Sequence, residues 1–212
     1  MSQLALDRLK QRFGAAILET HSDFGDDTAL VEPSEWRAVG KFLREDPSLD
    51  FDMCVDLCGV DYPERGAMGG RMEVVLHLYS ISKHHRIRVK ARVGDEDMDG
   101  AEIDSLVSIW PGLNWLEREV YDMSGVRFRG HPDLRRILMY PEFEGHPLQR
   151  TYPADRTQPL VPYRTEEEAG VPLHKIEPFG PDEGMPFGRK GAPRVTPAID
   201  EEGPNAKPAE AN

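Results

Sequence analysis

Two histidines have the residue type and the setting for chemistry: His131 and His146, each in a Gly-His-Pro turn. Glycine permits unusual backbone angles and proline keeps the preceding residue extended, so each imidazole is presented from a stiff corner. With Glu117 they could act as an acid–base set or bind a metal, because imidazole titrates near neutral pH. The sequence has no HExxH motif, and no cysteine or third histidine lies nearby to complete a zinc site. We therefore favour a structural role, in which each ring hydrogen-bonds to backbone or carboxylate and fixes its turn.

The acidic residues before these turns form a second candidate site. Glu117 and Glu119 flank Arg118, and Asp122 follows. Paired carboxylates can hydrolyse glycosidic bonds, but on a helix Glu117 and Glu119 would point about 160° apart. Arg118 and Asp122 would lie one turn apart and could form an ion pair. We therefore predict an ion network, within the fold or at an interface, rather than a catalytic pair.

A helix is expected to position these acidic residues. Its apolar residues recur three and four apart, and Gly125 stands where a helix end favours positive φ. The acidic residues and Arg118 are expected to fall largely outside the apolar face, which consists of Leu113, Leu116, Val120 and Met123. Residues 133–138 are predicted to form one or two helical turns, capped by Asp133.

Five arginines cluster around the two turns: Arg127, Arg129, Arg135, Arg136 and Arg150. Arginine pairs with carboxylates across desolvated contacts, so the cluster favours a protein–protein interface over a solvated surface. On this interpretation, reversing the charges of Arg135 and Arg136 lowers the yield of a complex and leaves the melting of the isolated domain nearly unchanged.

An ordered series of uncommon residue types runs through this stretch: Glu117, Arg118, Glu119, Asp122, Gly125, Gly130, His131, Pro132, Asp133, Leu134, Arg135, Arg136, Ile137, Leu138, Gly145, His146, Pro147 and Leu148. The series resembles the signature of the 30-kDa-subunit family of respiratory complex I, the NADH-quinone oxidoreductase of bacteria. The resemblance covers residues 28–163 and departs from the usual pattern at Ser124 and at residues 149–151. It implies that the signature residues serve contact and support, not catalysis.

The resemblance implies a non-catalytic assembly subunit in the peripheral arm of a proton-translocating oxidoreductase, a translocase that passes electrons from NADH to quinone. It implies that this chain holds no cofactor or metal, and that FMN and the iron–sulfur clusters lie in partner subunits. The implied partners are a large, 49-kDa-like subunit at the quinone site and a small iron–sulfur subunit. The implied location is peripheral, on the cytoplasmic side of the inner membrane, with membrane contact only through the complex.

Two alternatives stay open. One is the equivalent subunit of a related complex, such as an energy-converting hydrogenase or a coenzyme-F420 dehydrogenase, in which the electron donor differs. The other is a free-standing acid–base enzyme using His131, His146 and Glu117. The purified chain would then turn over a small substrate alone, and His131→Ala would abolish that activity without releasing any partner.

The composition restricts the class of protein. A net charge of −12 argues against binding to nucleic acid or to anionic lipid, since both need a basic face. The two cysteines, Cys54 and Cys58, would lie about 13 Å apart on a strand, too far for a disulfide. We interpret them as reduced, half-buried residues of a cytoplasmic protein. The sequence has no secretory signal and no apolar run long enough to span a membrane.

The hydrophobic pattern along the chain predicts an α+β fold, a two-layer sandwich with helices on one face of a mainly antiparallel sheet, followed by an extended C-terminal arm. Residues 21–27 and 94–100 are predicted to be loops, and Ser34 is expected to cap the second helix. The predicted helices cover residues 6–17, 35–46, 103–109 and 113–124. The predicted strands cover residues 28–31, 71–80 and 84–93, together with a helical turn running into a strand within 51–61.

Eleven of the 18 prolines lie at or beyond Pro153, where hydrophobic periodicity also ends. We therefore divide the chain into a domain at 1–152, an extended arm at 153–190 and a disordered tail at 191–212. Aromatic and aliphatic residues recur within the arm, which suggests that it lies over a partner and becomes ordered on binding.

Overall fold

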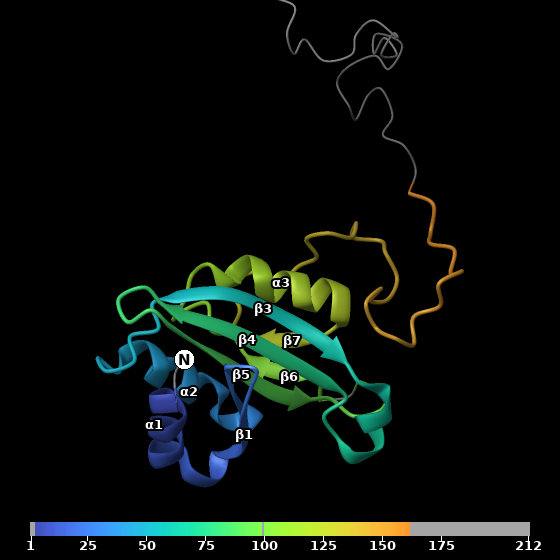
Figure 1. Cartoon of the computed structure of the whole chain (residues 1–212). Helices are drawn as coiled ribbons and strands as arrows, with labels where there is room; N and C mark the ends of the chain where they lie inside the picture. The colour runs from blue at the N-terminus through green and yellow to red at the C-terminus, as the bar shows by residue number, and fades with distance from the viewer. Residues whose placement is uncertain (1–2, 99, 162–212) are drawn as a thin grey trace, which may run out of the picture. The chain divides into compact units, whose positions relative to one another are not determined.

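The computed structural model describes residues 3–98 and 100–161 (Figure 1). The greater part of the arm predicted for 153–190, and the whole tail predicted for 191–212, lie outside the described residues. The helices are α1 (Gln3–Phe13), α2 (Trp36–Glu45) and α3 (Leu113–Ser124), with 3₁₀ turns at Gly14–Ala16, Pro33–Glu35 and Pro63–Met68. The strands are β1 (Ile17–Asp23), β2 (Asp26–Val31), β3 (Met53–Asp61), β4 (Met72–Ser80), β5 (His85–Val93), β6 (Glu102–Asp104) and β7 (Arg127–Arg129).

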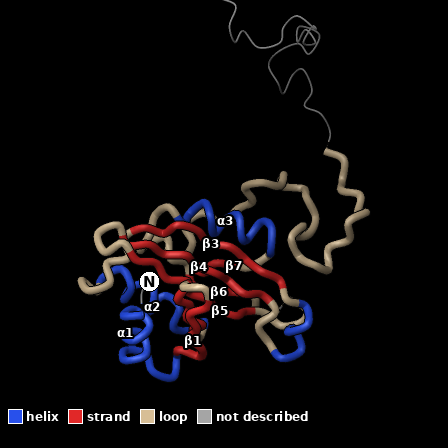
Figure 2. The backbone as a smooth tube through the Cα atoms, in the orientation of Figure 1, coloured by secondary structure: helices blue, strands red, loops and turns tan. Residues whose placement is uncertain are grey.

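Five strands form the main sheet in the order β1-β2-β5-β4-β3 (Figure 2). All neighbours in it pair antiparallel except β2 and β5, which run parallel. The connection between these two strands contains α2, β3 and β4, which gives the long crossover that a parallel pair needs. The predicted hairpin of β4 and β5 is confirmed, with Val74 opposite Ala91 and Leu76 opposite Val89. The two short strands β6 and β7 pair parallel with each other as a separate ribbon. The α+β class is thereby confirmed.

The helices pack on one face of the main sheet and form a single core with it. Alternate residues of β4 and β5, such as Leu76 and Val89, are buried on this face beside α1 and α2. The helix α3 lies over β3 (Figure 1), and the approach is close: a Cβ on Gly59 would stand 3.1 Å from Val120 Cγ1. The opposite face carries the intervening polar residues of β5. Within the described residues, no helix is long and apolar enough to span a bilayer.

The structure corrects two of the predicted elements near the N-terminus. Residues 17–23, expected to finish the first helix and begin a loop, form the edge strand β1. Their side chains are mostly polar and exposed, so the strand has no apolar alternation to reveal it. Ser34 does not cap α2: a 3₁₀ turn precedes the helix, and Glu35 occupies its N-cap position without a side-chain hydrogen bond.

Two further predictions are wrong, both in segments where the spacing of the apolar residues suits a helix as well as a strand. Residues 103–109 form the short strand β6 and a turn rather than a helix, with Ile103 buried opposite Phe128. The helical turn predicted before β3 is absent from 51–61, where the chain enters the strand directly at Met53. Short apolar runs do not distinguish the two periods, and tertiary pairing decided both cases.

The end of α3 supplies a stability prediction. Gly125 has φ +88°, and an added Cβ would lie 2.8 Å from His146 Cδ2. We expect Gly125→Ala to lower the free energy of unfolding by about 1–2 kcal/mol, because an L-residue is strained there. Gly112 is the matched control at the other end of the helix, with φ −61° and no atom within 4 Å of an added Cβ. Chemical denaturation should place Gly112→Ala within about 0.5 kcal/mol of wild type; equal losses in both variants would refute the explanation.

Candidate functional site

The buried carboxylate of Asp122 organises the signature segment. It lies on α3, which presents Glu117 and Asp122 to the interior together with Leu113 and Val120. The prediction that both acidic residues fall outside the buried face is therefore wrong. Apolar periodicity cannot identify a carboxylate that is buried because a distant segment supplies its hydrogen-bond donors.

Three successive backbone N–H groups converge on one oxygen of Asp122. The amides of Ile137, Leu138 and Met139 donate to Oδ2 at 3.0, 2.8 and 2.8 Å. Arg136 Nη1 donates to Oδ1 at 2.6 Å. Burial alone would raise the pKa of Asp122, but these amides and the guanidinium hold it below its usual value. The carboxylate is therefore stabilised as an anion inside the protein.

This arrangement replaces the helical turns predicted for 133–138. The segment has no helical hydrogen bonding, because its polar groups bond to α3 instead. Arg118 donates from Nε to the carbonyl of Arg135 (3.1 Å) and from Nη2 to that of Arg136 (3.0 Å). The predicted ion pair between Arg118 and Asp122 does not form. Instead, Arg118 bonds to carbonyls of the segment and Asp122 bonds to its amides and to Arg136. Asp133 does not cap a helix but forms an exposed ion pair with Arg135 at 2.7 Å.

Each imidazole contacts a backbone carbonyl, as the structural interpretation expected. His131 Nε2 lies 3.1 Å from the carbonyl of Asn114, and its Nδ1 accepts the amide of Asp133 at 3.0 Å. His146 Nδ1 lies 2.9 Å from the carbonyl of Asp122. Since a carbonyl only accepts, both rings donate to α3 and fasten the two turns to it. Gly130 and Gly145 have φ of +79° and +89°, as the Gly-His-Pro pattern predicted.

A second buried carboxylate holds the segment after the second turn. Asp61, at the end of β3, accepts Arg71 Nε at 2.8 Å and the amide of Arg150 at 2.8 Å. Arg71 Nη2 also donates to Thr151 Oγ1 at 2.8 Å. Gln149 Nε2 donates to the carbonyl of Ser124 at 2.9 Å. Residues 149–151 therefore carry the contacts that hold this segment against α3 and the end of the sheet.

Neither Asp61 nor Arg71 was predicted as a site residue. The pairing of β3 with β4 was not predicted either, and it is this antiparallel register that places Asp61 opposite Met72, the neighbour of Arg71. An acidic and a basic residue at adjoining strand ends can pair across them.

The third buried carboxylate, Glu117, is only partly satisfied. Its Oε1 accepts the amide of Leu106 at 2.7 Å, while Oε2 has no hydrogen-bond partner among the described residues. Burial raises the pKa of Glu117 to about 7, against the opposing effect of Ser105 and the Leu106 amide. Glu119 is exposed, so the two glutamates do not form a joint site.

The hydrogen-bonded signature residues lie in three places. One group meets at the C-terminal half of α3 and consists of Arg118, Asp122, Arg136, Gly145 and His146. His131 bonds to Asn114 at the N-terminal end of the helix, and Glu117 bonds to the segment after β6. The five-arginine cluster is also divided. Arg136 is half-buried and bonded to Asp122, Arg129 pairs with Asp104 at 3.0 Å, and Arg127, Arg135 and Arg150 are exposed. Clustering in sequence therefore combined an internal cross-link with true surface charges.

Among the described residues, no three His, Cys, Asp or Glu side chains lie close enough together to bind a metal ion. Cys54 and Cys58 are free and half-buried, as predicted. Burial first, and then the charge of Asp56, raise the pKa of Cys54 to about 12, which keeps the thiol protonated.

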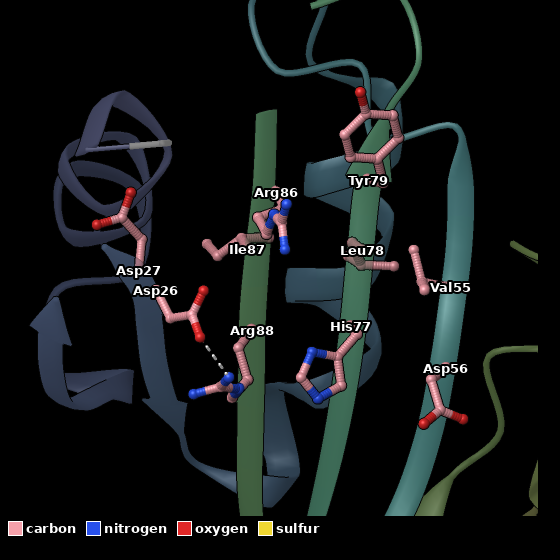
Figure 3. A pocket seen from close by; sticks show the side chains of 10 residues that line it. All are labelled: Asp26, Asp27, Val55, Asp56, His77, Leu78, Tyr79, Arg86, Ile87 and Arg88. Carbon is pink, nitrogen blue, oxygen red and sulfur yellow. Dashed lines mark hydrogen bonds and ion pairs between the residues drawn. The ribbon is translucent and has the colours of Figure 1, made fainter. Parts of the chain in front are cut away.

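A hollow of about 440 Å³ lies on the sheet face opposite the helices (Figure 3). Its lining includes His77, Arg88 and Asp56, which point outward from β4, β5 and β3. Arg88 is held by Asp26, 2.9 Å away on β2. Burial, and then the charge of Arg88, lower the pKa of His77, which favours the neutral imidazole.

The sequence of this chain is similar to those of known proteins. The sequence profile of the family described as "Respiratory-chain NADH dehydrogenase, 30 Kd subunit" matches residues 29–158. A subunit of the NADH-quinone oxidoreductase of Geobacter sulfurreducens is 44% identical over 149 residues, which cover 70% of this chain and 88% of the relative. The same subunit from a Methylobacterium species is 42% identical over 151 residues, 71% of this chain and 67% of the relative.

Two solved structures have folds similar to the fold of this chain. A trypsin-resistant fragment of Nqo5 has a TM-score of 0.52 and 25% identity, covering 61% of this chain and 99% of the fragment. A chain of the membrane-bound sulfane sulfur reductase, an archaeal respiratory membrane complex, has a TM-score of 0.59 and 23% identity, covering 71% and 84%. The second likeness is one of fold alone.

The division of the arginines changes the expected effect of mutating them. The Arg136 side chain is 18% exposed and its removal would leave Asp122 buried without its cation. We expect Arg136→Ala to lower the free energy of unfolding by roughly 3 kcal/mol or more. Arg135, 68% exposed, is the matched control, and Arg135→Ala should cost less than about 0.5 kcal/mol. Urea denaturation of both variants tests this, and equal costs would contradict it.

Glu117 should make stability depend on pH. Its folded pKa is raised to about 7, so between about pH 4.5 and 7 the folded chain binds more protons than the unfolded chain. The stability that protonated Glu117 provides is thus complete below pH 4.5 and is lost as pH rises through 7. We expect the wild type to lose roughly 2–3 kcal/mol relative to Glu117→Gln between about pH 5 and 8.

Denaturation of both proteins across this pH range measures the difference. The lowered pKa of His77 has the opposite effect, with stability lost as pH falls below its ordinary value. That contribution is common to both proteins and cancels in the comparison. Parallel pH profiles would contradict the role assigned to Glu117.

Proposed function

Because the chain belongs to the family of the 30-kDa subunit of respiratory-chain NADH dehydrogenase, we propose that it is a non-catalytic assembly subunit in the peripheral arm of a proton-translocating NADH-quinone oxidoreductase. Its work is to hold neighbouring subunits in place while they transfer electrons. The complex as a whole belongs to the translocases.

The observation that carries this proposal is the way the signature segment is built. Four of its polar side chains are used internally: Asp122 bonds to Arg136 and three amides, and both histidines bond to carbonyls of α3. A catalytic set would need such groups directed at a substrate. Here they make an irregular backbone rigid, which suits a preformed contact surface.

Exposed apolar side chains border this rigid segment. Trp115 on α3 is 67% exposed, and Leu138 and Leu148 are also exposed. The amides of Leu138 and Leu148 are fixed by Asp122 and by the carbonyl of Met123, so both side chains project from a fixed backbone. Together with the exposed Arg135, they provide the aromatic, aliphatic and guanidinium groups that dominate binding at protein interfaces.

The partners we propose are the large, 49-kDa-like subunit that contributes to the quinone site and the small iron–sulfur subunit. FMN and the iron–sulfur clusters belong to partner chains, since Cys54 and Cys58 alone cannot ligate a cluster. We place the chain peripherally on the cytoplasmic side of the inner membrane, held there by the complex. The domain bounds 1–152, 153–190 and 191–212, with the middle segment wrapping a partner, remain part of this proposal.

The first residues of the proposed arm are bonded to the domain, so the arm begins as a continuation of the fold. Arg156 forms an ion pair with Glu144 at 2.6 Å, and Gln158 Oε1 accepts the Glu144 amide at 2.9 Å. These contacts hold residues 156–158 against Glu144, next to the second Gly-His-Pro turn.

Assembly should depend on Trp115. We expect Trp115→Ala to weaken association with the other subunits of the oxidoreductase roughly 30-fold, the effect of losing about 2 kcal/mol of interface contact. Affinity purification of the tagged full chain from native membranes, with the accompanying subunits identified by mass spectrometry, measures the loss.

Phe24 serves as the control, because it is a fully exposed aromatic residue at the turn between β1 and β2. Phe24→Ala should leave the recovery of subunits unchanged. A wild-type chain that recovers no other subunit, or that turns over a small substrate alone, would overturn the proposed function.

A further inference from the structure

A row of basic residues lies on the sheet face opposite the helices. Arg86, Arg88, Lys90 and Arg92 alternate along β5, so their side chains leave the same face of the sheet. Figure 3 shows one end of this row, where Arg88 pairs with Asp26. The other end of the row, near the 3₁₀ turn at Pro63–Met68, has a different balance of charge.

Three cations converge there on one buried carboxylate. Glu73, 2% exposed, lies 2.8 Å from Lys90 Nζ, 3.0 Å from Arg65 Nη1 and 3.4 Å from Arg92 Nε. Burial alone would raise the pKa of Glu73, but Lys90 and Arg65 hold it below its usual value. One carboxylate balances one of the three cations. A second carboxylate, Glu19, reaches the group, with its Oε2 4.0 Å from Arg92. Three cations therefore meet two carboxylates in these ion pairs.

The three cations are held in position and remain accessible. Arg65 lies over the Tyr62 ring at 3.8 Å, and each of the three side chains is anchored at Glu73. Their exposed fractions are 30% for Arg65, 23% for Lys90 and 37% for Arg92. Cations that are already oriented lose little side-chain entropy when a further anion binds.

We propose that these four residues, Arg65, Glu73, Lys90 and Arg92, which we call the Glu73 cluster, dock an acidic segment of another subunit of the complex. The inference rests on the proposed function and adds a second contact surface with a partner of defined charge. A chain with net charge −12 repels an acidic partner over most of its surface, so a local positive excess determines where that partner can bind. Guanidinium groups also suit carboxylates, because they offer paired donors.

The first test removes two of the three cations and keeps the one that neutralises Glu73. The double variant Arg65→Gln with Arg92→Gln leaves Lys90 to balance Glu73, so the buried carboxylate keeps a cation. The control is Lys41→Gln with Arg44→Gln on the exposed side of α2. It also removes two charges, each from a 3.9 Å ion pair, and the exposure of Arg44, 39%, matches that of Arg92.

Affinity purification of each full-length variant from native membranes at increasing salt gives the readout. Recovery of the other oxidoreductase subunits should fall roughly 5-fold at low salt for the Glu73-cluster variant and stay at the wild-type level for the control. The deficit should shrink at high salt, where screening removes the wild-type advantage. Equal recovery from both variants would overturn the inference, while wild-type recovery would still support the proposed function.

The second test does not depend on the stability of a charge-removing variant. Arg92→Lys keeps the charge and adds a lysine amine. A carbodiimide activates carboxylates, and a lysine amine in contact with an activated carboxylate forms an amide with release of the urea. In the assembled complex, we expect cross-links from positions 90 and 92 to Asp or Glu residues of another subunit. Cross-links restricted to Glu73, Glu19 or the chain's own acidic run at residues 166–168 would refute docking of a partner.

Discussion

A buried anion must be provided with donors, and in this protein that requirement fixes the segment that contains the family signature. Removing a carboxylate from water costs far more than any single hydrogen bond returns. Asp122 is stabilised only because the amides of residues 137–139 and the Arg136 guanidinium all reach it. The irregular backbone from Arg136 to Met139 is therefore held in one conformation without a helix or a strand.

Further hydrogen bonds fix the chain on either side of that segment. Asp61 and Arg71 connect the end of β3 to residues 150–151, and the two imidazoles connect their turns to α3. A loop fixed in this way presents its exposed side chains with little flexibility, which lowers the entropy lost on binding. Glu117 is the exception. One of its oxygens has no partner within the described part of the chain, and its raised pKa reflects a carboxylate that is buried more completely than it is compensated.

Charge is distributed unevenly over the two proposed contact surfaces. The signature segment combines exposed apolar groups with an exposed Asp133–Arg135 pair, whereas the Glu73 cluster combines three cations with one carboxylate. The first surface suits a partner that buries apolar area. The second suits a partner selected by charge. A protein that uses both can be oriented on its neighbours by electrostatics and retained by hydrophobic contact.

The sequence by itself determined the elements whose signal is local. Alternation fixed β4 and β5, the apolar spacing and Gly125 fixed α3 and its end, and the order of rare residues fixed the family. Only the tertiary structure decided that Glu117 and Asp122 are buried, that Arg136 is internal while Arg135 is not, and that β1 pairs at the sheet edge. Periodicity reports which side of an element avoids water. Whether a charge can share that side depends on donors supplied from elsewhere in the chain, as Arg136 supplies them to Asp122.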